Sequence, residues 1–288
     1  MEASASCLHG LSRLIWSLKT FVEIESLNPK ERPANKKTRM ILPNAITLIG
    51  VCIGLSSIKF ALDGKFALSV VAILFAGLMD ALDGRIARLI KGTSKIGKEL
   101  DSLGDVISFG VAPAFIMYFW NLQYLDKLGW LVCLIYVVCV ALRLARFNVN
   151  SNEEPSWRDN FFEGIPSPAG GIIVLMPLIF SFSGFGKPNF ILDYNLIVPI
   201  FFITISILLI STIPTYSFKK IVIPKGMTKF LLFGIVLFFG LLFVYTFKVI
   251  AISGLIYLSL IPISYLHYKK IKKQNNISII KDENDDLE

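Results

Sequence analysis

Long apolar runs recur along most of the chain, and they limit its possible folds more than any other feature. A helix of about 18 or more apolar residues is long enough to cross a bilayer. We therefore predict about eight transmembrane helices, at 42–62, 66–90, 99–121, 128–147, 166–183, 193–213, 229–247 and 249–267. With a mean hydropathy of +0.65 and only 17% charged residues, the chain is too apolar for a soluble domain. The sequence thus predicts an all-α, polytopic integral membrane protein.

Composition divides the chain into four parts. Residues 1–40 form an N-terminal segment, 41–215 the main membrane region, 216–268 two additional helices, and 269–288 a charged tail. Apolar residues at helical spacing within 8–22 indicate either an interfacial helix or a leader without fixed structure. The tail turns from basic to acidic, so we expect it to be disordered.

Lysine and arginine concentrate on alternate loops when both termini are placed on the same side. The exceptions are Lys59, Lys65, Lys127, Lys187 and Lys248. Because basic loops stay in the cytoplasm, this pattern predicts a protein of the cell membrane with cytoplasmic termini. The net charge of +8 is then explained by topology, and we expect no nucleic-acid partner.

Four aspartates stand out because charge inside a membrane span is costly and usually marks function. Asp80 and Asp83 lie three residues apart near the end of one predicted span, and Asp101 and Asp105 lie four apart near the start of the next. Each pair shares one helix face. The connection between the two spans is short, so the helices are expected to be antiparallel neighbours whose acidic faces meet.

Helix length places both pairs at a similar depth. The residues 66–79 put roughly 21 Å of helix between Asp80 and the outer surface, and 106–121 supply roughly 24 Å on the other helix. Carboxylates gathered in the inner third of the membrane repel one another unless cations neutralise them. All-oxygen ligands favour Mg²⁺ or Mn²⁺, and two such ions about 4 Å apart would fit.

Neighbouring residues suit a phosphate ester beside this metal site. Gly84 and Ala87 reduce side-chain bulk on the turn after Asp83, which lets a ligand approach the backbone. Arg88 can make a paired contact with phosphate oxygens, and Ser94 offers a hydroxyl on the short loop.

From Asp80 to Asp105 the chain matches the pattern DxxDGxxARx8GxxxDxxxD at every position, and it thereby resembles the CDP-alcohol phosphatidyltransferase family. The resemblance implies a six-helix core within 41–215 and a homodimer. It also implies residue roles: metal binding by Asp80, Asp83 and Asp101, completion of the site and general-base catalysis by Asp105, and contacts to CDP-diacylglycerol from Gly84, Arg88 and Ser94. Asn44 and Thr47 resemble a further nucleotide-binding element of the family, although a helix cap would explain them nearly as well.

Two other segments bear on the acceptor alcohol. Arg143, Arg146 and Asn148 lie in RLARFN at the end of the fourth span, and residues 162–171 read FEGIPSPAGG. Both resemble bacterial family members that use L-serine, which implies transfer of the phosphatidyl group to serine with release of CMP. The arginines could hold a carboxylate-bearing substrate, or they could be topological anchors or clamps for the lipid phosphate. The run at 164–171 is expected to shape the pocket and allow close packing.

Other interpretations remain. The same chemistry could use glycerol 3-phosphate, inositol or choline as the acceptor. A divalent cation transporter is a rival from another class, but such proteins place the ion site near the midplane, whereas these acids lie toward one face. A histidine-nucleophile mechanism with paired HxKxxxxD motifs is excluded, because the only histidines are His9 and His267 and no second motif copy exists.

Overall fold

The computed structural model describes residues 36–90, 95–150, 161–184, 194–216 and 227–285, and these are almost entirely helical. The chain forms two compact units, Met1–Leu42 and Pro43–Glu288, and the second contains every element from α3 onward. In chain order the elements are α2 (Lys36–Leu62), α3 (Phe66–Ile90), α4 (Lys95–Asp105), the π-helical η1 (Val106–Val111), α5 (Ala112–Trp120), the 3-10 turn η2 (Leu122–Leu125), α6 (Asp126–Asn150), β1 (Phe161–Glu163), α7 (Ser167–Val174), α8 (Met176–Ser183), α9 (Tyr194–Ile210), β2 (Pro214–Tyr216), α10 (Thr228–Val244) and α11 (Thr246–Asp285).

The predicted all-α, polytopic architecture is confirmed. Within the described residues, five helical stretches are long and apolar enough to cross a membrane: Leu42–Leu62, Phe66–Ile90, Ile96–Trp120, Leu122–Val149 and Thr246–Lys269. Two shorter apolar helices, Asn195–Ile210 and Thr228–Val244, correspond to two further predicted spans. Helix α10 has no buried residue, as expected of an apolar helix that lipid surrounds. The total of eight spans stays a prediction.

The span predicted at 166–183 is broken into two short helices. Pro177 stands in the first turn of α8, where its missing N–H cannot continue the hydrogen-bond ladder of α7. Helix α7 therefore ends at Val174, and Leu175 forms the joint. The predicted continuous helix is wrong at this point.

A two-stranded sheet, which no pattern in the sequence predicted, joins β1 to β2 in antiparallel register. Gly164 follows β1 with a φ of 72°, a conformation that L side chains rarely adopt. Its N–H donates to the Ile213 carbonyl at 3.0 Å, and its carbonyl accepts from the Thr215 hydroxyl at 2.7 Å. These bonds hold the entrance to α7 against the end of α9.

The core lies where α6 packs along α9 and against η1. Tyr136 and Phe202 are fully buried there, with ring centroids 4.9 Å apart. A Cβ added at Gly171 on α7 would come within 3.1 Å of the Phe109 backbone. Only glycine allows α7 to approach η1 this closely, which agrees with the close packing predicted for the 164–171 run.

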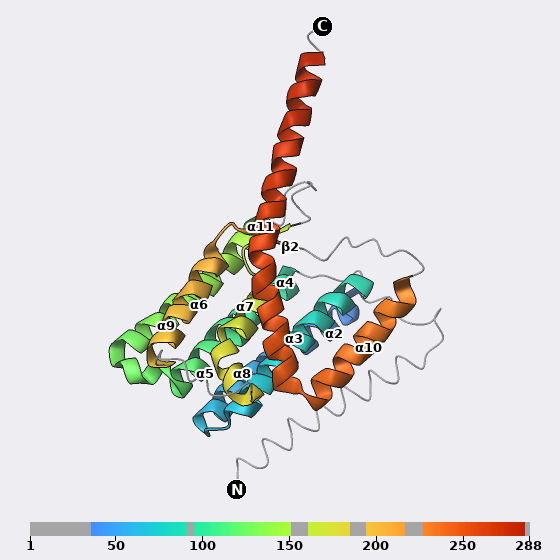
Figure 1. The fold of residues 1–288 in the computed structure, drawn as a ribbon. Coiled ribbons are helices and arrows are strands. Elements are labelled where there is room, and N and C mark those ends of the chain that lie inside the picture. Colours follow the sequence, from blue (N-terminus) through green and yellow to red (C-terminus); the bar gives the residue numbers. More distant parts are fainter. Residues whose placement is uncertain (1–35, 91–94, 151–160, 185–193, 217–226, 286–288) are drawn as a thin grey trace, which may run out of the picture. The chain divides into compact units, whose positions relative to one another are not determined.

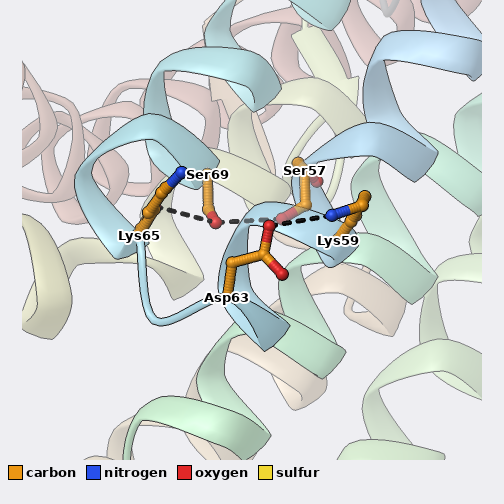
Figure 2. Close-up of polar contacts among 5 residues, drawn as sticks. All are labelled: Ser57, Lys59, Asp63, Lys65 and Ser69. Carbon is orange, nitrogen blue, oxygen red and sulfur yellow. Dashed lines mark hydrogen bonds and ion pairs between the residues drawn. The ribbon is translucent and has the colours of Figure 1, made fainter.

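The turn between α2 and α3 is built from local polar contacts (Figure 2). The buried Ser69 hydroxyl donates to the Ser57 carbonyl at 2.9 Å and ties the two helices together. On the exposed side, the Lys59 ammonium lies 2.8 Å from the Asp63 carboxylate. This hydrogen bond holds the pKa of Asp63 below its ordinary value.

Helix α11 passes α8 and reaches β2 (Figure 1). It continues to Asp285, so the prediction that the tail from residue 269 is disordered is wrong. A helix that is already nucleated extends at little cost, and the lysines and glutamine that follow are good helix formers. The predicted N-terminal helix at 8–22 lies outside the described residues.

Candidate metal and headgroup site

Helices α3 and α4 bring the predicted acids together. One carboxylate oxygen from each of Asp80, Asp83 and Asp101 lies within 4.8 Å of the other two. The i,i+3 spacing on α3 turns Asp80 and Asp83 to one face, and α4 presents Asp101 to that face. The expected meeting of two acidic helix faces is thus present, and these three residues could hold a metal ion.

Asp105 occupies the last position of α4, directly before the π-helical turn η1. Its carboxyl group is hydrogen-bonded to that of Asp80. Two carboxyl groups can approach this closely only if a proton or a cation lies between them. The buried Tyr136 hydroxyl donates to the Phe109 carbonyl of η1 at 2.8 Å and so supports the wider helical turn beside Asp105.

Helix α2 contributes Thr47, whose hydroxyl lies 2.6 Å from an Asp83 carboxylate oxygen. The same hydroxyl is 3.1 Å from the Pro43 carbonyl one turn earlier. Because α2 begins at Lys36, Asn44 lies inside the helix and is not a helix cap. That alternative explanation of Asn44 and Thr47 is therefore wrong, and Thr47 instead orients one of the grouped acids.

A small cavity lies among these residues. Besides Thr47 and the four aspartates, it is lined by Gly50, Val51, Ala76, Gly104, Ser108 and Phe109. A Cβ added at Gly104 would meet the Val51 side chain at 3.1 Å, so the small residue lets α4 lie close to α2. The cavity thus has acids from α3 and α4 on one side and a hydroxyl from α2 on another.

The residues predicted to contact the headgroup follow the acids along α3. A Cβ added at Gly84 would meet no described atom within 4 Å, so packing does not require glycine there. Arg88 is exposed, and its Nε donates to the Gly84 carbonyl at 3.0 Å. Ala87 is partly buried, and Ser94 lies outside the described residues.

The three candidate acceptor residues on α6 have different surroundings. Arg143 is partly buried, donates to the Ser167 hydroxyl, and interacts electrostatically with Asp105. Arg146 donates to the Ile210 carbonyl at the end of α9 at 2.8 Å, and Asn148 donates to the Ser102 hydroxyl at 2.9 Å. Of these three residues, Arg143 is the one that interacts electrostatically with an acid of the site, Asp105.

Among the described residues, basic side chains balance the negative charge of the site only in part, through the electrostatic interaction of Arg143 with Asp105. Within the described part of the chain, no lysine or arginine forms an ion pair with Asp80, Asp83, Asp101 or Asp105, and the ion pair that does occur there is Lys59 with Asp63. Clustered carboxylates away from bulk water need a compensating charge. The donor set, all carboxylate oxygens with a hydroxyl close by, fits a hard divalent cation.

Two features of the site were not predicted from the sequence. Ser108 lies three residues after Asp105 and seven after Asp101, so helical spacing could have placed it on their face. The bond from Thr47 to Asp83 joins residues far apart in the chain, and no local spacing signals it.

Comparison with known proteins agrees with the motif. A model of the CDP-alcohol phosphatidyltransferase family matches residues 40–203. The matching relatives include three proteins named CDP-diacylglycerol–serine O-phosphatidyltransferase. The one from Mycobacterium tuberculosis is 38% identical over 200 residues, 67% of this chain and 66% of that protein. The one from Helicobacter pylori is 33% identical over 220 residues, 76% of this chain and 88% of that protein. The one from Saccharomyces cerevisiae is 33% identical over 223 residues, 70% of this chain and 80% of that protein.

The match covers less than two thirds of the length of two mycobacterial relatives: 66% of the M. tuberculosis protein and 49% of the Mycobacterium leprae protein.

Proposed function

The chain belongs to the CDP-alcohol phosphatidyltransferase family, and from this premise we propose that it transfers the phosphatidyl group of CDP-diacylglycerol to the hydroxyl of L-serine. The products would be phosphatidylserine and CMP. The observation that carries the proposal is the group of three carboxylates within 4.8 Å of one another, inside the segment that the family model matches. The names of the relatives support serine as the acceptor.

Asp80, Asp83 and Asp101 would hold Mg²⁺ or Mn²⁺, and Asp105 would complete the site. Two ions are proposed, as in other two-metal sites that act on phosphate esters. When bound, such ions polarise phosphate oxygens and offset their negative charge. Thr47 would keep Asp83 oriented toward the ion, as its 2.6 Å contact suggests.

The CDP-diacylglycerol headgroup would lie along the end of α3, next to the acids. Gly84 and Ala87 would let the phosphates approach the helix, and the open space beside Gly84 supports this. Arg88 would bind phosphate oxygens, with Ser94, Asn44 and Thr47 as further contacts.

The acceptor would lie toward α6, where Arg143 interacts electrostatically with Asp105. Arg143 would bind the serine carboxylate. Arg146 and Asn148 are proposed to act nearby, and their contacts to Ile210 and Ser102 support a role in holding the shape of this end of the pocket.

The reaction would be a single displacement. Asp105 removes the proton of the serine hydroxyl, and the oxygen attacks the phosphorus that carries the diacylglycerol. The bond from this phosphorus to the bridging oxygen of the pyrophosphate breaks, and CMP leaves. No cysteine or histidine lies among the residues that line the cavity, so a direct attack suits the site.

We also propose that the protein lies in the cell membrane with this site facing the cytoplasm, because basic residues concentrate on that side. A cysteine introduced at Lys65, in the turn between α2 and α3, would then react with an impermeant reagent in intact cells. The family resemblance further favours a homodimer, which cross-linking in native membranes would test.

The decisive experiment is an acceptor panel. Purified protein in detergent receives CDP-diacylglycerol and Mn²⁺ with L-serine, glycerol 3-phosphate, inositol or choline, and CMP is measured. Among the four acceptors, we expect rapid CMP release only with L-serine. Release with another alcohol would reassign the acceptor within the family, and no release with any alcohol would contradict the proposed function.

A further inference from the structure

Helix α11 lies beyond the segment that the family model matches, yet it packs against α8 and β2 of the described structure. Figure 1 shows both elements along its course. Ile250, Ala251 and Ser264 are buried on the packed face of α11, and Tyr257 lies one helical repeat before Ser264 on this same face. The C-terminal helix therefore presents a tyrosine hydroxyl to the interior of the protein.

Three buried side-chain donors in this area have no described partner. These are the Tyr257 hydroxyl, the Nε of Arg143 and, two turns further along α11, the Ser264 hydroxyl. The Tyr257 hydroxyl approaches Thr215 but makes no hydrogen bond to it, and the Thr215 hydroxyl donates to the Gly164 carbonyl at 2.7 Å. Leaving a buried donor unpaired costs about 1–3 kcal/mol. Arg143 and Tyr257 are near enough to interact electrostatically, so their two donors call for a ligand with acceptor atoms.

These donors lie close to the reacting group. The Arg143 guanidinium interacts electrostatically with both Asp105 and Tyr257, and its terminal nitrogen is held by the Ser167 hydroxyl. Arg143 thus lies near both the proposed base and the tyrosine of α11. A small molecule that reaches from Asp105 to this pair needs a hydroxyl at one end and an anionic oxygen group a few bonds away.

We propose that Tyr257 of α11 and Arg143 of α6 together bind the carboxylate of the acceptor, so that the C-terminal helix selects a hydroxy acid over a plain alcohol. This inference rests on the proposed function and names the residue that gives it specificity. In L-serine the hydroxyl oxygen and the carboxylate carbon are separated by two carbon atoms. The carboxylate would accept from the tyrosine hydroxyl and from Arg143 Nε while the hydroxyl faces Asp105.

The test is the variant Tyr257→Phe, which removes one hydroxyl and keeps the ring. Steady-state CMP release is measured against L-serine, against serinol, which lacks the carboxylate, and against CDP-diacylglycerol. We expect the KM for L-serine to rise about tenfold, the KM for CDP-diacylglycerol to stay within about twofold, and the preference for serine over serinol to fall. Arg143→Lys, which keeps the charge and loses Nε, should raise the serine KM as well.

The matched control is Tyr265→Phe, because Tyr265 lies on the same helix and is 48% exposed. It should leave both KM values and the thermal midpoint unchanged. If Tyr257→Phe leaves the serine KM unchanged, or raises both KM values together, the inference is wrong. If wild-type protein releases no CMP with serine, the proposed function itself fails, and the two failures are thereby distinguished.

Discussion

Helix α3 has aspartates near both of its ends, and their surroundings differ completely. In the turn before α3, Asp63 is exposed and paired with Lys59 at 2.8 Å (Figure 2). Near the other end, Asp80 and Asp83 meet further acids of α4, with no ion pair to a described lysine or arginine. Asp63 is thus neutralised by a lysine one helical turn away in the same chain. The carboxylates around Asp80 instead need a cation that binds from solution.

The largest expected effect comes from Asp105→Asn, which keeps the side-chain shape but cannot accept the serine proton. We expect CMP release to fall by about 10³-fold, within the range for loss of a general base. Gel filtration and the thermal midpoint would confirm that the variant is folded. Near-normal turnover would contradict the role of Asp105.

The second largest effect is expected from removing divalent ions. These cations should bind at the end of α3 that contains Asp80 and Asp83, and not near Asp63. Chelation should abolish CMP release, and added Mn²⁺ should restore it. Independently of activity, Mn²⁺ should stabilise the folded protein by about 2.7 kcal/mol at 100 times its Kd. The rise in thermal midpoint on adding Mn²⁺ should be lost in Asp101→Asn and kept in Asp63→Asn. Equal rises in the two variants would contradict the proposed difference between the two ends of α3.

A smaller effect is expected for Thr47→Val, which removes the hydroxyl that contacts Asp83. Loss of such a supporting contact weakens metal binding by about 10–100-fold, so the Mn²⁺ concentration for half-maximal activity should rise about tenfold. Thr204→Val is the matched control, because its exposed hydroxyl bonds within its own helix, to the Ile200 carbonyl. An equal response of the two variants would exclude a specific role for Thr47.

The smallest effect is expected for Asp63, in the turn before α3. Asp63→Asn should leave CMP release and the thermal midpoint unchanged near pH 7, because exposed ion pairs stabilise proteins little. The lowered pKa of Asp63 fixes the sign of the pH dependence: any stabilisation by the pair is present above the ordinary pKa of 3.8 and disappears as the pH falls below it. A marked loss of activity at pH 7 would show that this turn also serves the reaction.

Most of the site was predictable because its information is local. The i,i+3 and i,i+4 spacings put Asp80 with Asp83 and Asp101 with Asp105 on shared faces, and the short loop made the two helices neighbours. The break at Leu175 was less predictable, because a proline inside an apolar run can be tolerated or can end a helix. The β1–β2 pairing was not predictable at all, because three-residue strands leave no periodic signal.

The sequence by itself determined the membrane class, the helical architecture and the acidic signature, because apolar length and residue spacing are properties of single helices. The tertiary structure alone decided that Thr47 orients Asp83, that Tyr136 supports the π-helical turn after Asp105, and that Tyr257 is near enough to Arg143 to interact electrostatically. Such contacts join helices that are distant in the chain. They depend on how side chains of several helices pack at once, which no pattern within one helix encodes.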